Sequence, residues 1–200
     1  MSFHPQMPYG TPQWHKSARK LADEGPAFAF TEENRQKLER ILARYPADRR
    51  KSALLPALYL VQEQQGYVSG QAMTHVAEAI GCSRAEVEDV VSYYVMFFTQ
   101  PVGKYVLQVC RTLSCALNGA GRVTEALCQH LGVKPGETTA DGMFTVMEME
   151  CLGACDRAPV VMVNNEHWHE CQSAEDVPAL VAGLRERGLA SLSGCVHKKE

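Results

Sequence analysis

The sequence predicts an α+β chain of two parts, an N-terminal four-helix bundle followed by an α/β domain. Up to Phe98, apolar residues recur at helical spacing between capping residues and stop signals. After Phe98 the pattern alternates between strand-like and helix-like segments. Of the 200 residues, 46% are hydrophobic, so the chain can bury a core and does not have the composition of a disordered protein.

Four helices joined by short links are expected in the first part, which is typical of a small helical bundle. They are predicted at about 31–45, 50–64, 70–80 and 84–94. Thr31 caps the first, and Ser83 with Glu86 forms a capping box ahead of the fourth. Pro46 ends the first helix, while Pro56 argues against the second unless it falls in the first helical turn.

The second part reads as strand, helix, strand, strand, strand, helix. The segments are 104–110, 121–132, 143–151, a hairpin over 159–171 that turns at Asn164 and Asn165, and 173–186. Ser173 and Asp176 mark the start of the last helix. This order is that of a thioredoxin-type fold, in which a right-handed crossover places the first two strands side by side.

The predicted organisation is therefore an extended arm, a bundle, an α/β domain and a tail. Their ranges are 1–30, 31–98, 103–188 and 189–200. The arm is rich in Pro, Gly and His and is expected to order only against a partner.

Charge and hydropathy exclude several classes of function. The net charge is -3 and no basic patch stands out, so nucleic acid is not an expected ligand. No apolar run approaches the roughly 18 residues that a membrane helix needs. The N-terminus lacks the apolar segment of a secretory signal, and three prolines by residue 12 argue against an amphipathic transit peptide. We expect a cytosolic protein, in which cysteines are better candidates for metal ligands or catalytic thiols than for a disulfide framework.

Two close pairs of cysteines carry the chemistry. Among eight cysteines, only Cys110 with Cys115 and Cys151 with Cys155 are near one another, and each pair follows a predicted strand. Ligand chemistry gathers at the carboxyl ends of strands in open α/β sheets. If the two strands are neighbours, four thiolates converge and need a cation, either zinc or a 2Fe–2S cluster.

Spacing favours the cluster and keeps zinc as the alternative. Four residues separate the first pair, three the second, and 35 lie between the pairs, whereas zinc knuckles most often have two between cysteines. Gly119, Gly121 and Gly153 are expected to let backbone N–H groups approach the sulfurs. The remaining lone cysteines, Cys82, Cys128 and Cys195, are interpreted as small apolar residues, and no C-x-x-C redox motif is present.

Weaker features lie around this site. His167, His169 and Cys171 alternate along a strand and could bind a metal, but a polar hairpin edge is the preferred interpretation. Arg111 and Arg157 each lie within two residues of a ligand cysteine, where they either offset charge or are solvated. Pro159 stands where thioredoxin-like folds often carry a cis proline.

The segments "VCRTLSC" and "ECLGACDRAPVVMVN" resemble the signature of one family, the thioredoxin-like 2Fe–2S subunits of bacterial complex I, the NADH:quinone oxidoreductase. The resemblance covers about residues 31–185. It implies a thioredoxin-like 2Fe–2S ferredoxin domain behind a four-helix part. It also implies that Cys110, Cys115, Cys151 and Cys155 hold one 2Fe–2S cluster.

The same resemblance implies the partners and the role. It implies an electron-transfer subunit beside the subunit that binds FMN and oxidises NADH, with the other complex I subunits as partners. The location would be cytoplasmic, peripheral on the inner face of the plasma membrane through the complex. NAD-reducing hydrogenases and NAD-dependent formate dehydrogenases share the motif, so their equivalent subunits are the alternative, next to a zinc-stabilised binding module and a free-standing ferredoxin.

The chain by itself is not expected to oxidise NADH. No dinucleotide fingerprint follows a strand, and no glycine-rich loop suits a pyrophosphate. NADH gives up two electrons as a hydride, so a flavin on the partner has to split the pair before a one-electron cluster accepts them.

Overall fold

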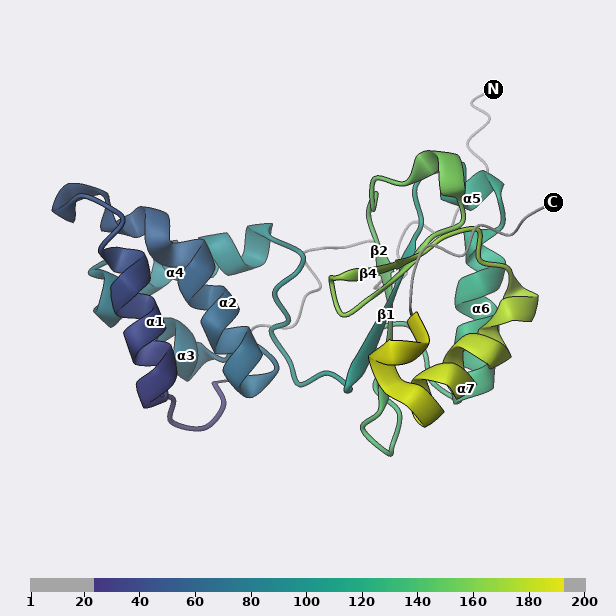
Figure 1. Ribbon diagram of the computed structural model, residues 1–200, viewed down its shortest axis with the longest axis horizontal. Helices are drawn as coiled ribbons and strands as arrows, with labels where there is room; N and C mark the ends of the chain where they lie inside the picture. The colour runs from purple at the N-terminus through teal and green to yellow at the C-terminus, as the bar shows by residue number, and fades with distance from the viewer. Residues whose placement is uncertain (1–23, 193–200) are drawn as a thin grey trace, which may run out of the picture. The chain divides into compact units, whose positions relative to one another are not determined.

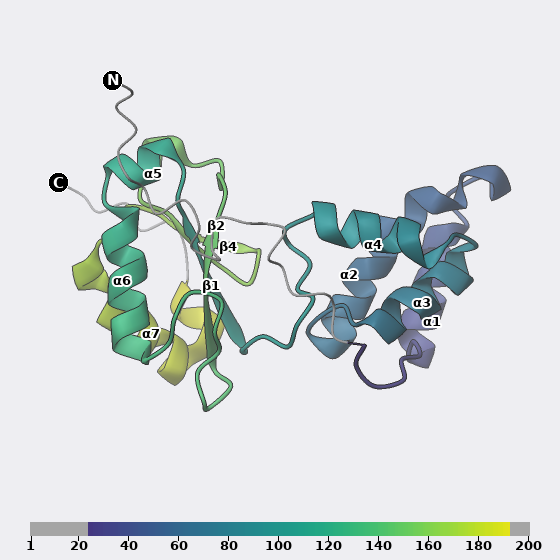
Figure 2. The same cartoon turned by 180° about the vertical axis from the view of Figure 1, so that it is seen from behind.

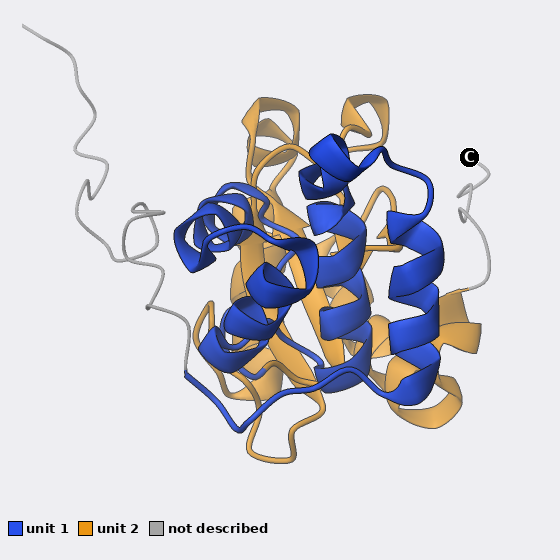
Figure 3. Ribbon diagram, turned by 90° about the vertical axis from the view of Figure 1, so that its left-hand side faces the viewer, with its two compact units in different colours: residues 1–101 blue, residues 102–200 orange. Residues whose placement is uncertain are grey.

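The computed structural model describes residues 24–192. The chain divides into two compact units, Met1–Pro101 and Val102–Glu200, which Figure 3 shows in blue and orange. Most of the predicted arm and of the predicted tail, with Cys195, lies outside the described residues.

The first unit is helical, and its helices share one hydrophobic core. It contains α1 (Glu32–Leu42), the 3-10 segment η3 (Ala47–Ala53), α2 (Leu54–Gln65), α3 (Gly70–Ile80) and α4 (Arg84–Tyr93). Leu58, Val61 and Val76 are completely buried in that core. The predicted caps are confirmed: Thr31 accepts a hydrogen bond from the backbone N–H of Asn34, and Ser83 and Glu86 form the capping box of α4.

Two predicted helix boundaries in this unit are wrong. α1 ends at Leu42, before Pro46, because the chain turns there with backbone bonds from the N–H groups of residues 43–45. α2 begins at Leu54 and not at residue 50, which places Pro56 in the first turn, where the missing N–H is not needed. The end of the predicted arm also packs on this unit, since Phe28 and Phe30 both contact the His75 ring.

The second unit is a four-stranded mixed sheet with helices (Figure 1). The strands are β1 (Tyr105–Cys110), β2 (Phe144–Met149), β3 (Val161–Val163) and β4 (His167–His169), in the order β2-β1-β3-β4. β1 pairs with β2 in parallel and with β3 antiparallel. The prediction that the first two strands of the domain are neighbours is therefore confirmed.

Two long helices cover one face of this sheet. α6 (Ala120–Leu131) links β1 to β2, and α7 (Val177–Arg187) follows the hairpin. Figures 1 and 2 show α6 and α7 side by side against the sheet. Val123 and Leu127 of α6 are buried in the core of the unit. The capping box of Ser173 and Asp176 exists, but it begins the 3-10 turn η5 (Ala174–Asp176), and α7 starts only after it.

The β3–β4 hairpin turns at the predicted asparagines. Asn164 and Asn165 have φ of 55° and 61°, the left-handed backbone that asparagine tolerates well. Their side chains fasten the turn to β1: Asn164 Oδ1 accepts from the N–H of Val106, and Asn165 Oδ1 accepts from the amide of the buried Gln108.

The segment before β2 runs along its outer side. Gly136 donates its N–H to the carbonyl of Val146 and Thr139 donates to that of Phe144. Thr138 forms an antiparallel bridge with Thr145. In residues 24–192, no helix is both long and apolar enough to cross a membrane.

Candidate metal centre

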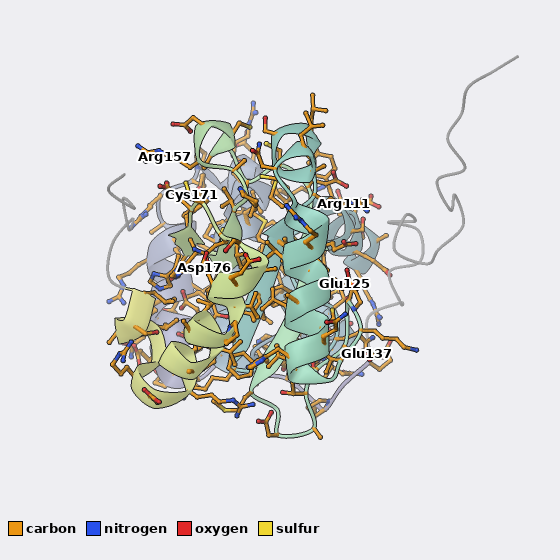
Figure 4. All side chains as sticks on the ribbon, turned by 90° about the vertical axis from the view of Figure 1, so that its right-hand side faces the viewer. Arg111, Glu125, Glu137, Arg157, Cys171 and Asp176 are labelled. Atoms are coloured by element: carbon orange, nitrogen blue, oxygen red, sulfur yellow. The ribbon has the colours of Figure 1, made fainter. Side chains whose placement is uncertain are left out.

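Two loops at one end of the sheet carry the four cysteines that the sequence singles out. β1 ends at Cys110, and β2 ends two residues before Cys151. Because β1 and β2 are parallel neighbours, with Cys110 opposite Met149, both loops leave the sheet at the same end. In Figure 4 the labelled Arg111 and Arg157, one from each loop region, lie toward that end.

The first cysteine loop, residues 110–115, places both of its cysteines in the core. It leads into α5 (Leu113–Leu117), a five-residue helix that the sequence analysis missed. Cys110 and Cys115 each expose only 2% of their surface, and both belong to the core of the unit. Hydrophobic neighbours and β1 therefore hold these two sulfurs in place.

The second cysteine loop, residues 151–155, lies at the surface. Cys151 and Cys155 are exposed, and their sulfurs are 3.9 Å apart. Gly153 between them has φ of +84°, a conformation that favours glycine, and its backbone N–H donates to the Cys151 sulfur. Cys155 begins the 3-10 turn η4 (Cys155–Arg157), which contacts α5 of the first loop.

Direct contacts join the two loops. The Oγ1 atom of Thr112 lies 3.3 Å from the sulfur of Cys110. The Thr112 hydroxyl also hydrogen-bonds the sulfur of Cys151. Ser114 hydrogen-bonds Cys155. Arg111 and Glu150, which flank Cys110 and Cys151, form an ion pair at 2.7 Å. The four sulfurs thus share one neighbourhood, although they come from two loops.

Each loop has one thiol with a lowered pKa and one with a raised pKa. Burial acts to raise the pKa of Cys110, but hydrogen bonds from the Thr112 hydroxyl, from backbone N–H groups of Thr112 and Leu152 and from Cys115 lower it overall. Burial and the hydrogen bond to Cys110 raise the pKa of Cys115 to about 11.

The second loop repeats this division of thiols. The Gly153 N–H, then the Thr112 hydroxyl and Cys155, lower the pKa of Cys151. The hydrogen bond with Cys151 raises the pKa of Cys155. A cation that takes all four sulfurs as thiolates has to displace the protons of these thiols.

The donor set fits an iron–sulfur cluster. Four thiols from two loops lie beside N–H donors at Thr112, Leu152, Gly153 and Val160, and such donors stabilise the negative charge of cluster sulfurs. The predicted role of glycine is confirmed at Gly153. Gly119 serves differently: it caps α6 in the left-handed conformation, next to the Arg122 side chain.

The other residues that the sequence singled out lie apart from this donor set. His167 and His169 are on β4; burial and the nearby His167 lower the pKa of His169. Cys171 lines a small pocket with Pro159 and Arg122, and the Ala158–Pro159 bond is cis. Within residues 24–192, no group of three or more His, Cys, Asp or Glu side chains is arranged around a point that could hold one metal ion. Cys82 and Cys128 are half-buried, and burial raises the pKa of both.

Comparison with known proteins agrees with this geometry. The model of the thioredoxin-like [2Fe-2S] ferredoxin family matches residues 38–185. NADH-quinone oxidoreductase subunit 2 of Thermus thermophilus is 42% identical over 158 residues, which cover 79% of this chain and 87% of that protein. A subunit of an NADH-quinone oxidoreductase of Rhizobium meliloti is 40% identical over 151 residues, covering 76% and 88%.

A solved structure shows the same fold at lower identity. It is the crystal structure of an NAD+-reducing [NiFe]-hydrogenase in the H2-reduced state, with a TM-score of 0.59 and 21% identity, covering 70% of this chain and 24% of that one. The likeness concerns the fold alone. From the family match and from relatives of at least 40% identity over most of their length, we conclude that the chain belongs to the thioredoxin-like [2Fe-2S] ferredoxin family.

Proposed function

We propose that the chain binds one 2Fe–2S cluster through Cys110, Cys115, Cys151 and Cys155, and that it transfers single electrons as a subunit of an NADH:quinone oxidoreductase. The observation that carries this proposal is the meeting of two cysteine pairs at the ends of the parallel strands β1 and β2, joined by contacts from Thr112, Ser114 and Arg111. Family membership supports the cofactor, and the names of the relatives support the complex.

When bound, the cluster supplies one-electron chemistry. The protein supplies four thiolates and the donors that stabilise their charge. The backbone N–H groups of Thr112, Leu152, Gly153 and Val160 already lie beside these sulfurs, and preorganised donors of this kind need little rearrangement when charge arrives.

Metal content tests the cofactor directly. The purified full chain should be red-brown and contain about two irons and two acid-labile sulfides, as a 2Fe–2S site requires. Serine at any of the four cysteines should reduce the iron content strongly. Matched variants Cys82→Ser and Cys128→Ser should keep it. One zinc per chain without iron, or normal cluster content in Cys151→Ser, would refute the assignment.

The partner is proposed to be the FMN-bearing, NADH-oxidising subunit of the same complex. We assign docking to the bundle formed by residues 31–98 and electron transfer to residues 103–188. The exposed second cysteine loop supports this, because electron transfer needs a donor close to the cluster and this loop leaves Cys151 and Cys155 accessible. The complex would hold the chain in the cytoplasm at the inner face of the plasma membrane.

Reconstitution tests the division of labour. Mixing the chain with its flavin-bearing partner should give NADH-dependent cluster reduction, which neither protein shows alone. Reduction of the flavin-free chain by NADH at a catalytic rate would contradict the proposal. The matched part of the NAD+-reducing hydrogenase, 24% of its chain, has the same fold, and an equivalent subunit of such an enzyme is the second candidate. This second candidate would be favoured if the flavin subunit of a hydrogenase, but not that of complex I, supports NADH-dependent reduction of the cluster.

A further inference from the structure

Thr112 stands at the N-cap position of α5 but does not cap the helix. Its backbone is extended (φ -81°, ψ 173°), as an N-cap should be, yet its side chain makes no capping hydrogen bond. Hydroxyls at the same position of other helices do cap: Thr31 accepts from Asn34 and Ser69 from Ala72. The Thr112 hydroxyl is therefore used for another interaction.

That interaction is with sulfur from both cysteine loops. Thr112 Oγ1 is 3.3 Å from the Sγ of Cys110, on its own loop, and it also hydrogen-bonds Cys151, on the other loop. Thiolates have no proton to give, so the hydroxyl has to be the donor when both cysteines bind a metal. A hydroxyl carries one proton and so donates to one sulfur at a time, or shares the proton between them.

We propose that Thr112 is a positioning residue. Its hydroxyl sets the reduction potential of the site because it donates a hydrogen bond to the sulfurs of Cys110 and Cys151. The inference rests on the proposed function, because it takes these two cysteines as cluster ligands. It adds a side-chain donor, distinct from the cluster ligands and from the backbone N–H groups, that tunes electron transfer.

The direction of the effect follows from charge. One electron from the reductant adds negative charge to the sulfurs of the site, while no bond forms or breaks and the proton stays on Thr112 Oγ1. A hydrogen bond to sulfur is stronger when the sulfur is more negative, so it favours the reduced state and raises the potential. Removal of the hydroxyl lowers the potential.

Two substitutions separate the hydroxyl from the shape of the side chain. Thr112→Val keeps the branched shape and removes the donor, and Thr112→Ser keeps the donor and removes the methyl group. Thr138→Val is the matched control, because the Thr138 hydroxyl bonds that of Thr145 near the start of β2, at the opposite end of the strand from Cys151.

The measurement is a spectroelectrochemical titration of the full chain with its cluster, beside iron content. At a fixed potential, Thr112→Val should lower the ratio of reduced to oxidised cluster about tenfold, which is a shift of about 59 mV for one electron. Thr112→Ser and Thr138→Val should stay within about twofold of the unchanged protein. Equal potentials for Thr112→Val and the unchanged protein, at full iron content, would overturn the inference and leave the proposed function standing.

Electron–nuclear double resonance of the reduced protein gives a second readout. One exchangeable proton signal, beyond those of the backbone N–H groups beside the sulfurs, should be present with Thr112 and with Thr112→Ser, and absent with Thr112→Val. The same exchangeable signals in all three proteins would count against the inference even if the potential moved. An unchanged chain that takes up no iron would instead overturn the proposed function, and this inference with it.

Discussion

The two cysteine loops hold the proposed cluster ligands in opposite environments. Cys110 and Cys115 are 2% exposed and belong to the hydrophobic core, whereas Cys151 and Cys155 lie at the surface on a loop shaped by Gly153 and a 3-10 turn. Folding itself orders the two sulfurs of the first loop, because Cys110 and Cys115 are part of the packing. The second has little burial to order it, so the metal has to contribute more.

This difference indicates a division between stability and access. The buried loop fixes one side of the site against the sheet, and the exposed loop gives solvent and redox partners a way to reach it. Potential, stability and metal exchange should therefore respond differently to changes in the two loops.

Removal of the metal should produce the largest difference between the loops. Chelation of iron should speed amide hydrogen exchange over residues 150–157 by about tenfold or more, because local opening follows the loss of ordering contacts. Residues 110–115, whose two cysteines are buried in the core, should change much less. Mass-spectrometric exchange of the full chain before and after chelation measures both. Equal increases in both segments would mean that the buried loop is no more preformed than the exposed one.

Removal of one sulfur should lower the free energy of unfolding more in the first loop than in the second. In the metal-free chain, Cys115→Ala should lower the free energy of unfolding by about 1 kcal/mol, since it leaves a small cavity in the core. Cys155→Ala should change it by less than about 0.5 kcal/mol, as is usual at the surface. Urea unfolding followed by circular dichroism gives both values. A larger loss for Cys155→Ala would reverse the comparison.

The ion pair between the loops should contribute a smaller amount. Arg111 and Glu150 meet at 2.7 Å, with 27% and 49% of their side chains exposed, so solvent screens the pair. Glu150→Gln should cost about 0.5 kcal/mol of unfolding free energy, and the cost should shrink in high salt. Asp156→Asn, in the second loop region next to Arg157, is the control. A cost for Glu150→Gln that is independent of salt would show that the pair is not what links the loops.

Ser114 should give the smallest effect. Its hydroxyl hydrogen-bonds Cys155, which is exposed, so water can replace it as a donor to that sulfur. Ser114→Ala should change the ratio of reduced to oxidised cluster by about twofold at most, well below Thr112→Val. The spectroelectrochemical titration described for Thr112→Val measures this ratio. If Ser114→Ala moves the potential as far as Thr112→Val does, then the burial of Cys110 is not what distinguishes the two hydroxyls.

The sequence could predict the sheet unit and its cysteines because the signals are local and strong. Alternation and capping mark the segments 104–110, 121–132 and 143–151, and the paired spacings mark the four cysteines. Adjacency of the first two strands then follows from the crossover rule. These steps need no knowledge of side-chain packing.

The rest depends on packing. α5 has five residues, too few to show a helical period. Nothing in the sequence marks the Thr112 hydroxyl as a partner of the cysteine sulfurs, and only the folded chain shows its hydroxyl turned to sulfur. The burial of Cys115 and the exposure of Cys155 are likewise invisible in two similar spacings, since they arise from neighbours far along the chain, such as the core that includes Leu184.

The outer strands of the sheet have a consequence for assembly. β4 is only three residues long, and the outer side of β2 is already paired with the segment around Thr138. Proteins shield their sheet edges in this way, and a shielded edge offers little free backbone to another chain. A neighbour in a larger complex would therefore not bind this unit by adding a strand to its sheet. It would have to recognise side chains on the helices and loops, so the specificity of assembly depends on the surface sequence and not on the backbone.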